Sequence, residues 1–139
     1  MYTTQRQRGS TLIDVCAACV MGSIAMVIAL PSYHNWIEGE RRNDAVDALQ
    51  RVQQAQAEYH AVHGGYAMKL DALPGTPREL SDRGLYRITM FSDGPDNFEV
   101  HASALPDGPQ ARDPSCAHVT LRVNTGVIAY EPSPRCWNP

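Results

Sequence analysis

The sequence predicts an α+β fold in which one long N-terminal helix packs on a four-stranded antiparallel sheet. Two observations lead to this prediction. A helical pattern continues through residues 11–63, and the second half of the chain contains four short segments with strand signals, in three of which apolar and polar residues alternate. Such alternation is typical of strands that are buried on one face. At 139 residues, the chain is short enough for these parts to form one domain.

The first part of the predicted helix is almost entirely apolar. Residues 12–30 read LIDVCAACVMGSIAMVIAL, and Asp14 is the one charged residue among them. At about 1.5 Å per residue, such a helix nearly spans the ~30 Å apolar core of a bilayer. Three interpretations compete: a cleaved export signal, a plain membrane anchor, and a segment held first by a membrane and later by protein. An export signal usually has a shorter apolar core, and a plain anchor does not explain the carboxylate.

The second part of the predicted helix is amphipathic. Polar residues, Asp44 among them, lie mostly off its apolar stripe. Gly64 and Gly65 end the pattern, and Pro31 and Gly39 are expected bend points. The stripe that we expect to face the core consists of Ala45, Ala48, Leu49, Val52, Ala55, Tyr59 and Val62.

The remaining sequence predicts a loop followed by the four strands. Residues 64–84 contain the breakers of LPGTP and are expected to form a loop with a short helical turn at residues 77–82. The strands are expected in YRITMF, NFEVHASA, CAHVTLRV and VIAY. Asn124, Thr125 and Gly126 are expected to form the hairpin turn between the last two strands.

The four cysteines form two unlike pairs. Cys116 and Cys136 lie near the C-terminus in a polar, proline-rich context, and they are natural disulfide partners if this part of the chain is exported. Cys16 and Cys19 lie within the apolar helix. We expect them to be buried there among small apolar residues and to remain reduced, which disfavours a redox or metal role.

Other polar residues give weaker signals. The net charge of −3 provides no general footprint for nucleic acid. Arg41, Arg42 and Arg51 are candidates for contact with DNA or lipid headgroups, although such residues more often form a solvated face or a contact between subunits. His60 and His63 are spaced to share a metal, but no acidic residue or cysteine lies at a spacing that would indicate a third ligand. The sequence has no nucleophile motif, phosphate loop or zinc pattern, so it predicts no enzyme, cofactor, metal site or small-molecule substrate.

A glycine, an acidic residue and a proline are spaced in a specific way around the apolar segment. A basic leader ends at Gly9 and is followed by STLID, the apolar run and Pro31. This pattern resembles the class III signal of type IV pilins and pseudopilins, whose usual form is G-F-T-L-I-E. The resemblance implies that prepilin peptidase cuts between Gly9 and Ser10 and methylates Ser10. It also implies that Asp14, in place of the family glutamate, supports assembly by neutralising the N-terminus of a neighbouring subunit, and that Pro31 is the family proline.

The segment LPSYHNWIEGERRNDAVDALQRVQQAQAEYHAVHGGYA and the terminal Cys…Cys-Trp pattern extend this likeness. They are similar to PilE-type minor pilins. The resemblance implies a pilin fold with a C-terminal disulfide loop, made of a leader (1–9), a transmembrane and filament-core half of the helix (10–31) and a soluble head (32–139).

The function implied by this resemblance is that of a structural subunit of a type IV pilus. Such a subunit is held in the inner membrane with its head in the periplasm, and it then assembles with other pilin subunits into an extracellular pilus used in adhesion or twitching motility. A DNA-uptake pilin and a type II secretion pseudopilin are the alternatives. The disulfide loop favours a pilin over most pseudopilins.

Cleavage is expected after Gly9, because the basic leader and STLID match the form of the pilin signal. Mass spectrometry of the membrane or filament protein should find a chain that begins with N-methylated Ser10. A mature chain that begins after Ala29 would instead identify an ordinary export signal and contradict the pilin interpretation.

Overall fold

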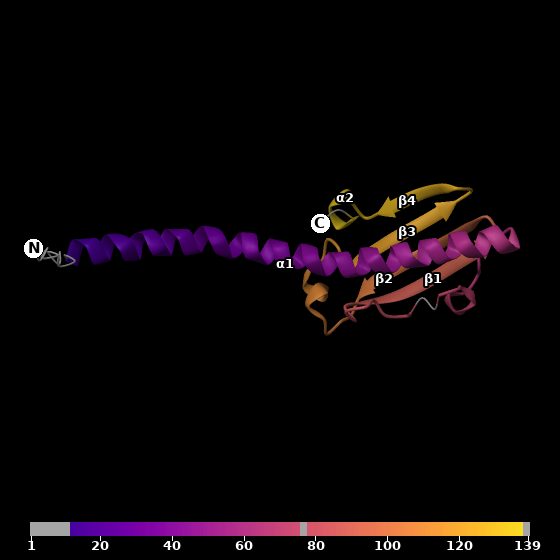
Figure 1. Ribbon diagram of the computed structural model, residues 1–139, viewed down its shortest axis with the longest axis horizontal. Coiled ribbons are helices and arrows are strands. Elements are labelled where there is room, and N and C mark those ends of the chain that lie inside the picture. Colours follow the sequence, from indigo (N-terminus) through magenta and orange to yellow (C-terminus); the bar gives the residue numbers. More distant parts are fainter. Residues whose placement is uncertain (1–11, 76–77, 138–139) are drawn as a thin grey trace, which may run out of the picture. The chain divides into compact units, whose positions relative to one another are not determined.

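A computed structural model describes residues 12–75 and 78–137 of the chain (Figure 1). Gly9 and Ser10, the predicted processing residues, lie outside the described residues. Cleavage and methylation at these positions therefore stay predictions.

The chain divides into two compact units, Met1–Trp36 and Ile37–Pro139. Helix α1, Leu12–His63, contributes to both units. It is helical at Pro31 and Gly39, and the bends that we expect there remain predictions. The long helix expected from the sequence is confirmed, and Gly64 ends it with a positive φ of 73°.

In the first unit, the described side chains of residues 12–27 are all exposed. Most of these residues are apolar, so this half of α1 has no polar face of its own. Over the part of the chain that the structure describes, no helix combines the length and the hydropathy of a membrane span.

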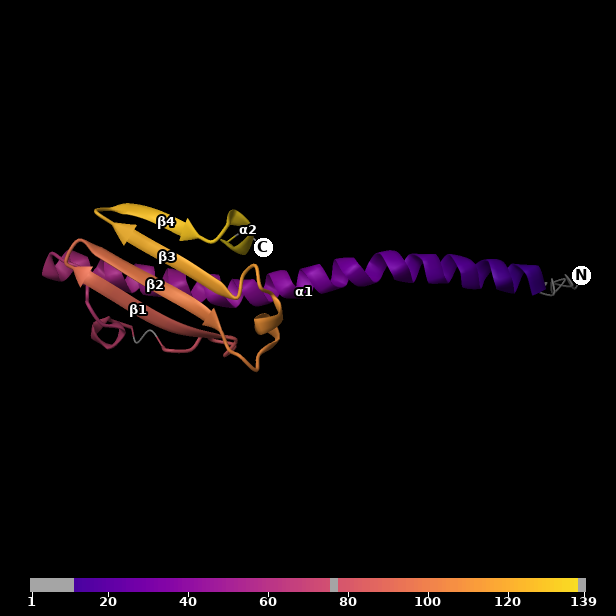
Figure 2. The same ribbon diagram turned by 180° about the vertical axis from the view of Figure 1, so that it is seen from behind.

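The second unit contains a four-stranded antiparallel sheet in the order β1–β2–β3–β4 (Figure 2). The strands are β1, Tyr86–Gly94; β2, Asn97–Ala104; β3, His118–Asn124; and β4, Val127–Glu131. Two short 3₁₀ helices, η1 (Leu70–Ala72) and η2 (Pro109–Arg112), and helix α2 (Pro134–Trp137) complete the unit. All four predicted strands, and with them the α+β fold, are confirmed.

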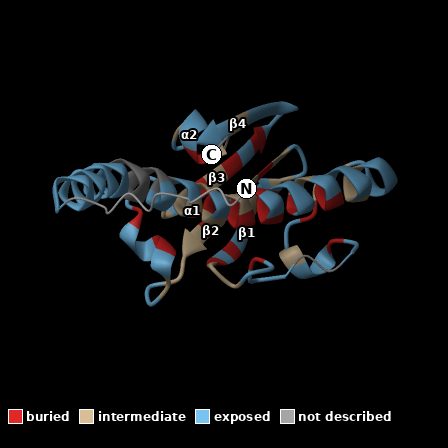
Figure 3. Cartoon of the chain, turned by 60° about the vertical axis from the view of Figure 1, so that its left-hand side comes forward, coloured by how far each residue is buried: buried red, intermediate tan, exposed pale blue. Residues whose placement is uncertain are grey.

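One face of the sheet packs against the second half of α1 and forms the core, which is red in Figure 3. The alternation predicted for the strands is confirmed, because every second residue of β3, of the first part of β1 and of most of β2 points into this core. Three of the core residues on α1 are alanines, and their short side chains allow the helix to lie close to the sheet. The core contributed by α1 and the strands includes Ala45, Ala48, Leu49, Val52, Ala55, Tyr86, Ile88, Phe98, Val100, Ala102, Val119, Leu121 and Val123.

The stripe predicted on α1 needs three corrections. Val62 was expected in the core but is 79% exposed, because it lies in the last turn of the helix. Asp44 was placed among the polar residues outside the stripe, yet it is buried. Gln56 is also fully buried, and its side-chain amide exchanges hydrogen bonds of 2.9 and 2.8 Å with the backbone of Ala67.

The loop before the sheet also differs from the prediction. Residues 78–82 are not helical, so the short turn expected at 77–82 is wrong over the described residues. Leu80 instead forms a β-bridge with Arg87, and the Ile88 N–H donates to the Glu79 carbonyl at 2.7 Å. The open edge of β1 gives this segment backbone partners that an isolated helical turn would not have.

The predicted hairpin turn between β3 and β4 is confirmed. Thr125 and Gly126 both have positive φ, at 47° and 81°. Positive φ at two successive turn residues matches the right-handed twist of paired strands, and glycine adopts it without strain.

The carboxylate of Asp44 holds the turn that leads into β1. It accepts hydrogen bonds from the Ser81 hydroxyl at 2.6 Å and from the backbone N–H groups of Arg83 and Leu85 at 3.0 and 3.4 Å. A buried acceptor with several donors restricts how the loop can lie on the helix. The burial of Asp44 is therefore explained by its carboxylate, which accepts the hydrogen bonds of the polar groups in this turn.

A buried ion pair joins α1 to the segment that follows η2. Arg42 Nε lies 2.7 Å from Asp113 Oδ2, and both side chains are almost inaccessible to solvent. Glu38 is a more distant and more exposed partner of Arg42, at 3.7 Å. Burial acts to raise the pKa of Asp113, but hydrogen bonds from Arg42 and Ser115 outweigh it and hold the pKa below its usual value.

Asp113→Asn is expected to destabilise the head by about 3 kcal/mol at neutral pH, because Arg42 would remain buried without its closest carboxylate. The folded pKa is lowered, so the stabilisation is present above about pH 4 and is lost as the pH falls through the folded pKa. Urea unfolding of the full chain at several pH values measures both effects. The variant should lose less stability than the parent on acidification.

Asp107→Asn is a matched control, since Asp107 is exposed in the loop between β2 and η2. It should unfold like the parent at neutral pH. Equal unfolding midpoints for the two variants would contradict a stabilising role for the buried pair.

Candidate functional site

The two residues predicted to act in assembly, Asp14 and Pro31, both lie on helix α1. Asp14 is in the first turn of α1, where a carboxylate interacts favourably with the helix dipole. Pro31 lies within the same helix. Their expected roles in assembly stay predictions, because both concern a second subunit.

Around Asp14, α1 exposes a long apolar surface. Large apolar side chains are solvent-accessible over the described first unit, and Leu12 at the start of the helix is 82% exposed. Exposed apolar surfaces of this extent mark contacts with other proteins or with lipid. The exposed set is Leu12, Ile13, Val15, Val20, Met21, Ile24, Met26 and Val27.

Cys16 and Cys19 belong to this exposed surface. Both are free thiols, as predicted, but both are exposed, so the expectation that they are buried is wrong for the single chain. The sequence indicates an apolar environment for this segment, and the described part of the chain does not provide one at these two thiols.

The disulfide predicted between Cys116 and Cys136 is confirmed. Both cysteines are fully buried, and the bond links the residues just before β3 to α2. The indole N–H of Trp137 donates to the Glu131 carbonyl at 3.0 Å, and its ring lies 4.8 Å from that of Tyr130. Helix α2 was not predicted, because four residues are too few to show a helical period.

Exposed residues near the C-terminal disulfide lie on two different faces of the sheet. Arg122 and Glu131 lie on one face of the sheet, and Arg122 Nη1 is 3.3 Å from Glu131 Oε1. Tyr130 pairs with the buried Leu121 and so lies on the opposite face. Two different surfaces are therefore available at this end of the sheet.

The arginines proposed as DNA or lipid contacts on α1 are mostly engaged within the chain. Arg42 is buried against Asp113, and Arg51 Nη1 lies 2.9 Å from Asp82 Oδ2. Arg41 is half-buried. This stretch of the helix therefore does not present a continuous basic surface.

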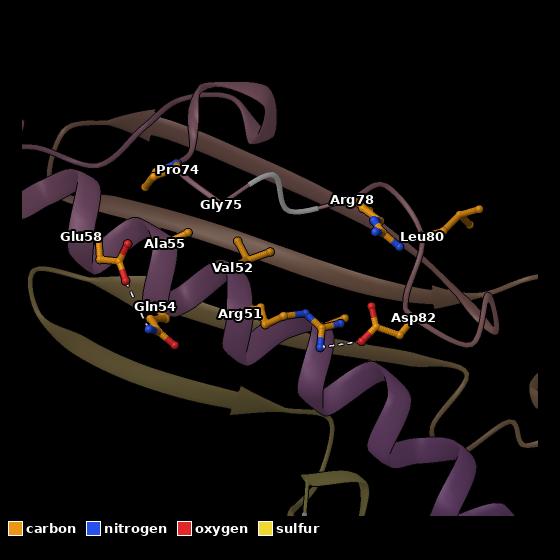
Figure 4. A pocket seen from close by; sticks show the side chains of 11 residues that line it. Arg51, Val52, Gln54, Ala55, Glu58, Pro74, Gly75, Arg78, Leu80 and Asp82 are labelled. Carbon is orange, nitrogen blue, oxygen red and sulfur yellow. Dashed lines mark hydrogen bonds and ion pairs between the residues drawn. The ribbon is translucent and has the colours of Figure 1, made fainter.

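A cavity of ≈ 320 Å³ lies beside Arg51, between α1 and the segment that precedes β1 (Figure 4). Its charged lining residues are two arginines and two acids, Arg51, Arg78, Glu58 and Asp82. Arg51 pairs with Asp82, and the Gln54 amide donates to Glu58 at 3.2 Å. The cavity is therefore balanced in charge, and it has no excess of cations that would attract an anionic ligand.

The histidines at the end of α1 are engaged with aromatic rings. His63 stacks on Tyr59 with centroids 3.9 Å apart, and the ring of His60 lies 4.7 Å from that of Tyr66. Within the described ranges, no group of three or more His, Cys, Asp or Glu side chains is placed to hold a metal.

A long helix packed on a four-stranded antiparallel sheet, with a disulfide near the C-terminus, is the pilin fold predicted from the sequence. Residues 31–120 match the protein family described as type IV minor pilin ComP, DNA uptake sequence receptor. The chain belongs to this family of type IV minor pilins. The match includes the second half of α1 together with β1 and β2. Among curated proteins, no sequence matches this pilin.

Loss of the disulfide in this minor pilin, by Cys116→Ser, is expected to lower the free energy of unfolding of the head by roughly 3 kcal/mol. The bond closes a loop with a sequence separation of 20 residues, and the C-terminal tail has few other contacts with the sheet. Denaturant unfolding of the full chain, with and without reductant, measures this loss. Cys16→Ser is the control and should unfold like the parent; an equal loss in both variants would contradict the stabilising role of the bond.

Proposed function

We propose that this minor pilin is cut after Gly9, held in the inner membrane by residues 10–31, and then assembled into a type IV pilus through the same segment. The observation that carries the proposal is the apolar surface of the first unit, whose described side chains from residue 12 to 27 are exposed. Such a surface is costly in water and requires a covering partner. Lipid covers it before assembly, and the helices of other pilin subunits cover it in the filament.

Asp14 has a specific part in this assembly. A carboxylate within an apolar bundle is stabilised when it lies beside a positive charge, and an unpaired charge there is costly. The methylated N-terminus at Ser10 of a neighbouring subunit provides such a charge. The pair fixes the register of one helix against the next, because a shift along the axis separates the two charges.

Asp14→Ala is expected to be processed and to reach the membrane normally but to enter filaments less efficiently. Asp14→Glu should retain or improve incorporation, because it keeps the charge and restores the residue that the pilin signal usually has. Immunoblots of sheared filaments and of membranes from the same cells measure the two steps separately. Unaltered incorporation of Asp14→Ala would exclude charge pairing as the device that sets the register.

Binding of DNA is a second candidate function, and the family match favours it, since the family is described as a receptor for DNA uptake sequences. We infer that the assembled pilin contacts DNA through its head. The net charge of −3 means that such contact needs a locally basic surface. Titration of the full chain with duplex DNA tests this function, and the affinity should fall steeply as the salt concentration rises.

A further inference from the structure

The face of the sheet that points away from α1 carries four side chains that are or can become cationic. We call it the outer sheet face and define its charged groups as Arg87, Glu99, His101, His118, Arg122 and Glu131. These residues alternate along the strands with the buried core residues, which places them together on the opposite side of the sheet.

The strand register brings these groups into adjacent rows. Arg87 pairs with Ser103 on β2, and Ser103 pairs with His118 on β3. In the next row, His101 pairs with Thr120, which pairs with Glu131 on β4. The outer sheet face is therefore a compact surface that crosses all four strands.

Each imidazole on this face is positioned by a hydroxyl group of the neighbouring strand. His118 Nδ1 lies 3.2 Å from the Ser103 hydroxyl, and His101 Nδ1 lies 3.0 Å from the Thr120 hydroxyl. Both hydroxyls can rotate to donate or to accept, so they accommodate the neutral and the protonated imidazole.

The two acids on the outer sheet face are already engaged with Arg122. Its Nη2 and Nε donate to the two carboxylate oxygens of Glu99 at 2.9 and 3.1 Å, and Nη1 lies 3.3 Å from Glu131. The hydrogen bonds from Arg122 hold the pKa of Glu99 below its usual value. Glu99 therefore remains charged around neutral pH, and both acids lie close to the guanidinium of Arg122.

The charge of this face depends on its histidines. With neutral imidazoles, the charges of Arg87 and Arg122 are balanced by those of Glu99 and Glu131, and the exposed Asp93 at the edge of the face adds a further negative charge. Histidine is the side chain whose ordinary titration lies between about pH 5 and 8. Each imidazole adds one positive charge to the face when it is protonated. His101 Nε2 is 3.4 Å from Glu99, and a charge there also competes with Arg122 for this carboxylate.

An exposed aromatic ring lies beside these cations. Phe91 on β1 is 62% exposed, and it lines a shallow cavity of ≈ 180 Å³ whose charged residues are Arg122, Glu99 and Asp93. The backbone of duplex DNA presents sugars beside its phosphates, so an apolar ring next to basic groups fits such a backbone better than it fits a small anion.

We propose that the outer sheet face binds the phosphate backbone of DNA, and that His101 and His118 make this binding stronger as the pH falls from about 8 to about 6. The proposal rests on the candidate DNA-binding function and assigns that function to a surface and a pH range. Arg42 of α1 is not available for this role, because it is buried against Asp113.

The test uses the full chain in detergent and a fluorescein-labelled duplex from genomic DNA of the source organism, with affinity measured by anisotropy at constant ionic strength. The affinity at pH 6 should exceed that at pH 8 by about tenfold, and the slope of log affinity against log salt should be steeper by up to about two, one for each added phosphate contact.

The double variant His101→Gln/His118→Gln should lose this gain on acidification, because glutamine retains hydrogen bonding without a titrating charge. His118→Lys should instead raise the affinity at pH 8, since it supplies a permanent charge at the same position. The control His60→Gln/His63→Gln also loses two histidines, but at the end of α1, and it should keep the full response. Thermal unfolding of each variant establishes that the head is folded.

The outcomes separate the two hypotheses. Absence of DNA binding at both pH values would contradict the DNA-binding function and, with it, the assignment to this face. Binding that strengthens on acidification equally in the parent and in His101→Gln/His118→Gln would overturn the inference alone, as would binding that does not change with pH.

Discussion

The burial of one face of α1 against the sheet is the constraint on which the rest of the head depends. Leu49 and Val52 of the helix are almost completely buried in the same core as Tyr86, Val100 and Leu121 of the strands. This packing involves the second half of α1, which is the amphipathic part of the helix. In the first part of the helix, the described apolar side chains of residues 12–27 are exposed, and an exposed apolar surface of this kind marks contact with another protein or with lipid.

Buried polar contacts give this packing its specificity. Asp44 fixes the turn before β1, and Arg42 ties α1 to Asp113, which lies shortly before the disulfide-bonded Cys116. Apolar packing alone tolerates sliding of one surface over another, whereas a buried charge or acceptor must meet its partner. These contacts and the disulfide therefore hold the loops in place around a sheet whose outer face remains open to a ligand.

Much of the fold could be predicted because its signals are periodic. Buried and exposed residues alternate along β2 and β3, and the glycine of the β3–β4 turn marks a hairpin. The burial of Asp44 and Gln56 could not be predicted, because it depends on partners far away in the sequence. The end of the apolar stripe was placed too late, at Val62, because periodicity does not show where the sheet stops covering the helix.

The candidate sites were less predictable than the fold. Arg42 and Arg51 looked like surface cations, and only the folded chain reveals the acids that engage them. The histidines of the outer sheet face carry no local motif, since His101 and His118 come together through the pairing of β2 with β3. Cys16 and Cys19 were correctly predicted to be free, but their burial would require other subunits.

Those two thiols allow the most direct measurement of whether α1 assembles into a filament. Cys116 and Cys136 are disulfide-bonded, so a maleimide reagent should report on Cys16 and Cys19 alone. If neighbouring helices cover the first part of α1, both thiols should be protected in filaments sheared from cells and should react once the filaments are dissociated in detergent. Equal labelling before and after dissociation, or the absence of the chain from sheared filaments, would contradict assembly through this helix.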